Sequence, residues 1–246
     1  MRDCALFCGR AGVSHWLRLF GGGFMEVDLR VLELLSSKIC HDLISPVSAI
    51  NNGVELIEDI GESVTQEAMK LIGDSAVQSA RRLKLFRVAY GRAGSEANLP
   101  LRDIRPIIEQ YFEGGKIKML WDSSLELPEI TDACGALKTL INMLIMSEEI
   151  LAYGGEISLH RMGDGDTTGC RLEIVGKAAH LSPAFSAALD GTTPVEELTP
   201  RTIQSYVTGR FAAHFGLNVS SATPRDDRLD LMLTVRPNEY DKHPVL

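Results

Sequence analysis

The sequence lacks the long apolar runs that membrane-spanning helices require, and its N-terminus lacks the apolar centre of a signal peptide. No stretch of the 246 residues reaches about 18 consecutive apolar residues, and residues 1–24 carry charges throughout. We therefore expect neither a membrane span nor a secretory leader, and we expect the protein in the cytoplasm. Residues 1–25 are predicted to be a disordered extension, and Met25, which follows three glycines, is an alternative start.

Basic residues are too few for a chain whose main partner is nucleic acid or an anionic membrane. The 25 lysines and arginines face 33 acids, which gives a formal net charge of -8. Because both partners are bound through net basic surfaces, we expect neither. One basic cluster comprises Arg81, Arg82, Lys84 and Arg87. We interpret it as a solvated helix face; the alternative is that it meets the acidic surface of a partner protein.

Cysteine is scarce and irregularly spaced. The five cysteines are Cys4, Cys8, Cys40, Cys134 and Cys170. An odd, scattered set does not form a disulfide framework, and Cys4 and Cys8 have no second pair at the spacing of a zinc site. We therefore expect reduced thiols and no metal bound by this chain.

What the sequence does contain is helical periodicity in its first third. Apolar positions recur every three or four residues from Asp28 to Ile60, and again from Thr65 to Gly91. The first series is Leu32, Leu35, Ile39, Leu43, Pro46, Ile50, Gly53 and Ile57, and the second is Ile72, Ala76, Ser79, Leu83, Phe86 and Tyr90. Two helices joined by about four residues form an antiparallel hairpin. The spacing thus predicts a hairpin over residues 26–93.

A lone hairpin cannot cover its own apolar seam, so we expect two copies to pair into a four-helix bundle. The chain is therefore predicted to be a homodimer. The residues expected in the core of the dimer are Leu35, Ile39, Leu43, Ile50, Ile57, Ile72, Leu83 and Phe86.

The pattern changes after residues 94–101, which we interpret as a linker. Helices and strands then alternate, which predicts a layer of helices over a mixed sheet in residues 102–246 and an α+β fold class overall. The expected helices are 103–112, 131–152 and about 199–216, and the expected strands are 116–121, 156–162, 171–175 and a final pair that ends with 229–235.

His41 is the residue of most chemical interest in the first predicted helix. It lies two positions after Ile39, a rotation of about 200° that turns its ring away from the apolar seam. Its neighbours on that face are Ser37, Lys38, Ile44 and Ser45, so the ring is expected to be exposed. Pro46 removes the helical donor to the carbonyl of Asp42 and is expected to bend the helix. By itself, such a histidine is most often an ordinary surface residue.

The run His41–Ile50, HDLISPVSAI, resembles the H-box on the dimerisation helix of histidine kinases, and nine constrained positions match. The resemblance implies that His41 carries a phosphoryl group on a ring nitrogen. It also implies that Asp42 either orients the ring or handles its proton. The partner, a receiver domain, would supply the aspartate and the magnesium ion, so no cofactor is expected on this chain.

Residues 137–159 resemble the N-box helix, glycine turn and strand of the kinase ATP-binding fold, but the nucleotide-binding residues are missing. Met146 and Ser147 stand where the family has a magnesium-binding asparagine and an alanine, and a thioether is a poor magnesium ligand. Residues 176–180 lack the adenine-binding aspartate, and residues 197–203 lack the glycines of the phosphate lid. The resemblance therefore implies a degenerate ATPase-like domain that binds no nucleotide.

An H-box hairpin followed by such a domain is similar to the ChpT histidine phosphotransferases of alphaproteobacterial phosphorelays. This implies a homodimer that accepts phosphate from the receiver of a hybrid histidine kinase and passes it to the receivers of response regulators. From the rotation of the helix we expect receivers to dock through Lys38, Ile44, Ser45 and Ser48. Two alternatives stay open: an active kinase with a divergent nucleotide site, and a dimeric scaffold without catalysis.

Overall fold

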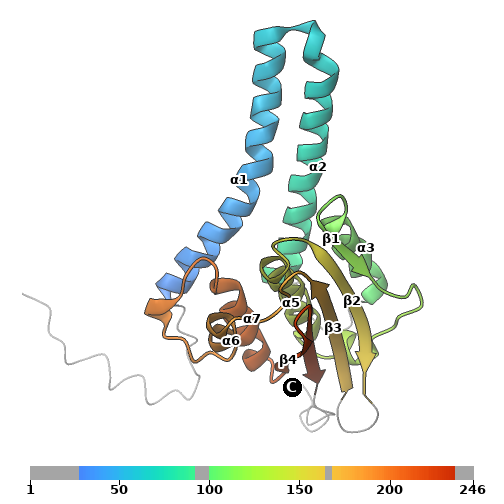
Figure 1. The fold of residues 1–246 in the computed structure, drawn as a ribbon, viewed down its shortest axis with the longest axis vertical. Coiled ribbons are helices and arrows are strands. Elements are labelled where there is room, and N and C mark those ends of the chain that lie inside the picture. Colours follow the sequence, from blue (N-terminus) through green and yellow to red (C-terminus); the bar gives the residue numbers. More distant parts are fainter. Residues whose placement is uncertain (1–27, 92–99, 164–167, 236–246) are drawn as a thin grey trace, which may run out of the picture.

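The computed structural model describes residues 28–91, 100–163 and 168–235, and they form a long helical hairpin above an α/β layer (Figure 1). The predicted extension 1–25 and most of the predicted linker lie outside these ranges. No helix in the described part of the chain combines the length and apolarity that crossing a membrane requires. The predicted α+β architecture is confirmed.

The hairpin consists of α1 (Leu29–Ile60), a short 3-10 turn, η2 (Glu62–Val64), and α2 (Thr65–Tyr90). Asp28 caps α1, because its carboxylate accepts a hydrogen bond from the backbone N–H of Arg30. Gly61 ends α1 with a φ of 82°, a conformation that glycine adopts without strain. Both helices therefore begin and end within one residue of the predicted bounds.

The seam between α1 and α2 differs in part from the spacing prediction. Pro46 and Gly53 of α1 and Ala68 and Ser75 of α2 are buried where the helices meet. Leu32, Ala76 and Leu83, which were expected in the seam, are exposed. The reason is geometric: the apolar stripes of α1 and α2 are wider than the contact between two helices, so the hairpin covers only part of them.

The second part of the chain forms one five-stranded mixed sheet with helices packed against it. Its elements are α3 (Leu101–Phe112), β1 (Ile117–Leu120), α4 (Pro128–Thr131), α5 (Ala136–Ile150), β2 (Gly155–Met162), β3 (Thr168–Gly176), α6 (Pro183–Leu189), η4 (Val195–Glu197), α7 (Ile203–His214), β4 (Asn218–Arg225) and β5 (Arg228–Val235). The strand order is β1-β2-β3-β5-β4, in which β1 pairs parallel to β2 and the other neighbours are antiparallel.

Alternate residues of the central strands point into the core, as a sheet with one covered face requires. Leu172 and Ile174 of β3 and Leu229 and Leu231 of β5 are fully buried, and α5 contributes an almost continuous run of buried residues to the same core. The helix α5 therefore lies in the centre of the domain. This position explains why its sequence is apolar on nearly every side.

Two element boundaries in this part of the chain were predicted wrongly. The expected helix 131–152 is interrupted, because Gly135 adopts a φ of 72° and α5 begins only at Ala136. A Cβ at Gly135 would overlap the ring of Phe215, so the glycine is also required by packing. The helix expected from 199 begins at Ile203, and the short helix α6 was not predicted.

The α/β layer is packed firmly against the base of the hairpin. Leu85 and Ala89 of α2 belong to the main core that also contains α5 and the sheet. On the other side, Leu34 of α1 packs with Leu198 and Ile203 in a second buried cluster. The N-terminal end of α1 thus packs beside the start of α7, and the C-terminal end of α2 packs in the core of the α/β layer.

Candidate functional site

His41 stands on the outer surface of α1, as the rotation of the helix predicted. Its side chain is 88% exposed, while Pro46, five residues further on, is buried against the hairpin. The helix continues through Pro46 without a break, and its N-terminal part leans away from α2 (Figure 1). A proline contributes no N–H to the carbonyl four residues before it, which here belongs to Asp42. The ring is therefore open to a second protein.

Asp42 lies between His41 and Lys38. One carboxylate oxygen, Oδ1, is 3.6 Å from Nδ1 of His41, and the other, Oδ2, is 3.6 Å from Nζ of Lys38. The side chain of Asp42 is only 17% exposed, in contrast to the ring beside it. The acid therefore faces the Nδ1 edge of the imidazole and leaves the Nε2 edge unobstructed by this contact.

Lys38 is held by the second part of the chain. Its Nζ donates a hydrogen bond of 2.7 Å to Oε1 of Glu149 in α5, and its side chain is 13% exposed. Burial acts to lower the pKa of Lys38, but the hydrogen bond and the attraction of Glu149, Asp42 and Glu148 outweigh it and raise the pKa above its ordinary value. Lys38 therefore stays protonated and bound to Glu149, and its side chain is less available to a partner than the sequence suggested.

A second polar cluster lies beside the first. Tyr111 of α3 donates a hydrogen bond of 2.6 Å to Oε2 of Glu148, and Arg82 of α2 donates to the Tyr111 hydroxyl at 3.3 Å. Burial raises the pKa of Glu148, and the attraction of Arg82 offsets part of that shift. These contacts join α2, α3 and α5 next to the Lys38–Glu149 ion pair.

The basic cluster of α2 is therefore only partly a solvated face. Arg82 contacts Tyr111 and Glu148, and Arg81 forms an ion pair with Glu113 after α3. Lys84 and Arg87 are exposed. The alternative prediction, contact with an acidic partner surface, stays open for Lys84 and Arg87.

The residues in the region that resembles a kinase N-box have structural contacts. Met146 is fully buried in the main core. The side-chain amide of Asn142 donates to the carbonyls of Ala89 and Lys138, and its oxygen accepts a 2.9 Å hydrogen bond from Gln204. Gln204 in turn accepts from the hydroxyl of Tyr90 at 2.8 Å. This buried polar chain ties α5 and α7 to the end of the hairpin.

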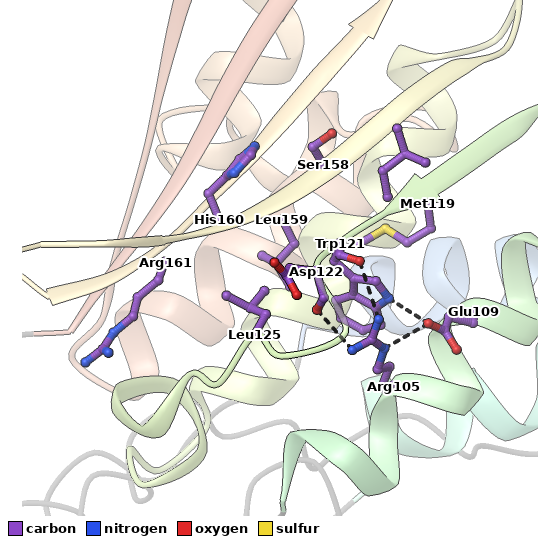
Figure 2. A pocket seen from close by; sticks show the side chains of 11 residues that line it. Arg105, Glu109, Met119, Trp121, Asp122, Leu125, Ser158, Leu159, His160 and Arg161 are labelled. Carbon is purple, nitrogen blue, oxygen red and sulfur yellow. Dashed lines mark hydrogen bonds and ion pairs between the residues drawn. The ribbon is translucent and has the colours of Figure 1, made fainter.

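A shallow hollow of about 630 Å³ is lined by residues of α3, of β1 and the segment after it, and of β2 (Figure 2). Arg105 stacks over the ring of Trp121 at 4.7 Å, and Glu109 accepts hydrogen bonds from both of these side chains. Arg105 also donates to the backbone carbonyl of Asp122. Two charged groups of the hollow, Arg105 and Glu109, therefore bind each other. In the described ranges no three histidines, cysteines or acids gather as metal ligands would.

The expected dimer-core residues fall into two groups. Leu83 is exposed, whereas the other seven are wholly or partly buried by contacts inside the chain. Phe86 belongs to the main core, and Leu35 packs on the cluster around Leu34. Of the expected docking residues, Ile44, Ser45 and Ser48 are exposed on α1 near His41.

An exposed histidine beside an acid on a long helical hairpin, followed by an α/β layer, is the arrangement expected of a histidine phosphotransferase. Comparison with known proteins agrees. Residues 101–227 match the model of the histidine phosphotransferase C-terminal domain family. The protein phosphotransferase ChpT of Brucella abortus (strain 2308) is 32% identical over 208 residues, which cover 82% of this chain and 96% of that protein.

A solved structure shows the same architecture. The 1.7 Å structure of a bacterial phosphotransferase is 28% identical, with a TM-score of 0.69, and the match covers 85% of this chain and 98% of that one. The chain belongs to the family of ChpT histidine phosphotransferases.

Proposed function

We propose that His41 is the phosphoryl carrier of a phosphorelay. In this proposal the residue accepts a phosphoryl group from the receiver aspartate of a hybrid kinase and passes it to the receivers of response regulators. The supporting observation is the exposed imidazole beside a carboxylate on the first helix, in a chain of the ChpT family. An exposed ring is required because phosphoryl transfer proceeds in line between the two proteins.

The transfer needs little chemistry from this chain. A neutral imidazole attacks the phosphorus with the lone pair of one ring nitrogen, a P–N bond forms, and the P–O bond to the receiver aspartate breaks. The released carboxylate stays with the receiver, together with its magnesium ion. Asp42 stands beside the ring, where it can balance the positive charge that develops on the phosphorylated imidazole.

The direct test is a phosphotransfer assay with the wild type and His41→Ala. A phosphorylated receiver should label the wild type at an acid-labile position and leave His41→Ala unlabelled. Label on both proteins would show that a residue other than His41 carries the phosphoryl group. Label on neither, with receivers still bound, would favour a dimeric scaffold without catalysis.

We infer that the receivers dock on the face of α1 around His41. Ile44, Ser45 and Ser48 are exposed there and offer a small, partly apolar contact surface next to the reacting ring. Lys38 lies at the edge of this surface, although its side chain is bound to Glu149. The proposed docking residues are the same as those expected from the sequence, and Ile44 is the only large apolar side chain among them.

We also propose that the protein is a homodimer. Three exposed residues of α1 lie seven positions apart, and so do three of α2: Cys40, Val47 and Val54, and Met69, Ala76 and Leu83. Val47 and Val54 directly follow the buried Pro46 and Gly53 of the seam, and Met69 and Ala76 follow Ala68 and Ser75. A step of one residue turns the side chain by about 100°. Because the helices are antiparallel, both stripes lie on the same side of the hairpin.

This shared stripe supports a four-helix bundle in which a second copy covers it. The seven-residue repeat is the spacing of helices that pack at a small angle, and the exposed valines, methionine and leucine would otherwise face water. The proposed interface therefore centres on Val47, Val54, Met69 and Leu83, next to the seam residues expected from spacing.

We propose in addition that the carrier works without ATP. Met146 is packed in the core, and Asn142 and Gln204 hydrogen-bond to each other within the chain. These contacts support a structural role for the region that resembles a nucleotide site. Calorimetric titration with magnesium-ATP should show no binding heat, and labelled ATP alone should leave the protein unlabelled. Labelling by ATP alone would favour the kinase alternative.

A further inference from the structure

The carboxylate beside His41 depends on a contact from the other half of the chain. Asp42 touches Lys38 four residues before it, at 3.6 Å. A lysine that precedes its acid by four residues has the weaker of the two orientations along a helix, and such pairs contribute little to helix stability. This pair alone would not fix Asp42.

Glu149 supplies the missing restraint. It lies 111 residues after Lys38 in the chain and on another helix, α5, yet accepts a 2.7 Å hydrogen bond from the lysine Nζ. The helix that carries Glu149 is buried along almost its whole length, so its end has little freedom to move. Glu149 therefore fixes Lys38 from the α/β layer, and the ammonium group of Lys38 provides a fixed positive charge beside Asp42.

The acidic groups around Lys38 all favour its positively charged form. Glu149 and Asp42 contact Nζ, and Glu148 adds to the negative charge around it. Glu148 is itself engaged by Tyr111 and by Arg82, so it does not compete for Lys38 at hydrogen-bond distance. The remaining contact of Asp42 points to Nδ1 of His41.

We propose that Lys38, anchored by Glu149, is a positioning residue that holds Asp42 against the Nδ1 edge of His41, so that Nδ1 carries the proton and Nε2 takes the phosphoryl group. The inference rests on the proposed function of His41. A carboxylate beside one ring nitrogen selects the tautomer with the proton on that nitrogen, which leaves the lone pair on the other. The lone pair of Nε2 forms the P–N bond, the donor's bond to phosphorus breaks, and the Nδ1 proton stays between the ring and Asp42.

The tautomer of His41 gives a readout that does not require a partner protein. Long-range proton–nitrogen correlation spectra of the histidine-labelled protein, taken at a pH where the ring is neutral, distinguish a proton on Nδ1 from one on Nε2. The signal of His41 is the one that His41→Ala removes. We expect the Nδ1–H form to dominate in the wild type, and the Nε2–H form to gain in Lys38→Met and Glu149→Gln.

Phosphoramidate serves as a small phosphoryl donor: its P–N bond breaks, the phosphoryl group passes to a histidine nitrogen, and ammonia is released. We expect the wild type to be phosphorylated on Nε2. Lys38→Met should react about tenfold more slowly and give a mixture of the two ring positions, because general-base and orienting groups contribute on this scale or above. Lys38→Arg should restore both the tautomer and the product, since it keeps the cation between the two acids. Lys70→Met, an exposed lysine of α2, is the matched control and should resemble the wild type.

Two failures can be told apart. If the wild type is phosphorylated at His41 but Lys38→Met keeps the same tautomer and the same phosphorylated nitrogen, the positioning inference is wrong. If His41 is not phosphorylated in the wild type, the proposed function is wrong, whatever the tautomer shows. Circular dichroism of each variant verifies that the helices are intact.

Discussion

Gly53 of α1 lies so close to Ile72 of α2 that a Cβ on the glycine would stand 2.6 Å from Cγ1 of the isoleucine. The same Cβ would be 3.2 Å from the carbonyl oxygen of Ala68. We therefore expect Gly53→Ala to destabilise the hairpin by about 1 kcal/mol, because the cost of overpacking, about 1–3 kcal/mol, exceeds the gain of alanine in a helix. The free energy of unfolding in urea, followed by circular dichroism, measures the change.

Gly73 provides the matched control for this substitution. It also lies in the middle of a helix, α2, but a Cβ there would meet no atom within 4 Å. Gly73→Ala should therefore stabilise the protein by about 0.5–1 kcal/mol, the usual preference of a helix for alanine over glycine. Equal effects of the two substitutions would show that the close approach at Gly53 is not restrictive.

The proposed dimer predicts different effects for two exposed residues of α2. Leu83 is 53% exposed on the shared stripe, whereas Val77 is 48% exposed on the outer side of the helix. Leu83→Glu should convert a dimer of twice 26.9 kDa into a single chain, because it places a charge in the centre of an apolar interface. Light scattering after gel filtration measures the mass. Val77→Glu should remain dimeric, and a wild type that elutes as a single chain would contradict the proposal.

Ile44 tests the docking surface. It is 61% exposed and lies three residues after His41 on the same face of α1. Ile44→Asp should slow transfer from a phosphorylated receiver by about 30-fold, since a central interface residue contributes about 2 kcal/mol and every 1.4 kcal/mol is tenfold. Its helical content should match that of the wild type, because the residue is not part of the core.

The control for Ile44 lies at the far end of the same helix. Ile60 is 55% exposed and is the last residue of α1, remote in sequence from His41. Ile60→Asp should leave the rate of transfer unchanged. If both variants slow the transfer equally, the effect comes from added negative charge and not from a lost docking contact.

The hairpin and the exposure of His41 could be predicted from the sequence because both follow from local spacing. The repeat of apolar positions sets the two helices, Gly61 ends the first, and the rotation from Ile39 to His41 fixes where the ring points. The same spacing did not distinguish the residues that meet inside the hairpin from those that the hairpin leaves exposed. Leu83 is the clearest example, since its place in the repeat is compatible with either.

The contacts of Lys38 could not be predicted, because they depend on how distant segments pack. Glu148 and Glu149 follow an apolar run, and the sequence offers no signal that they lie beside α1. Tyr111 likewise joins Arg82 and Glu148 only after α2, α3 and α5 have come together. Two adjacent acids at the end of a buried helix were the available hint, since charges at such places are usually paired.

Glu148 makes the stability of this junction depend on pH. Burial raises its pKa, and the attraction of Arg82 and the hydrogen bond from Tyr111 cancel part of the shift. The folded chain therefore binds a proton at Glu148 more readily than the unfolded chain does. The contribution of this carboxyl to stability is fully present below its unfolded pKa, and it is lost as the pH rises through the folded-state pKa.

Glu148→Gln removes the titrating group but keeps an acceptor for the Tyr111 hydroxyl. The measured quantity is the free energy of unfolding of the wild type minus that of Glu148→Gln. We expect this difference to increase as the pH is lowered from neutral to below the ordinary carboxyl pKa. The reason is that only the wild type gains a proton at this position on folding. Urea unfolding at a series of pH values measures this difference. A difference that falls on acidification would mean that the ion pair with Arg82 outweighs the burial of Glu148 and that the folded-state pKa is lowered.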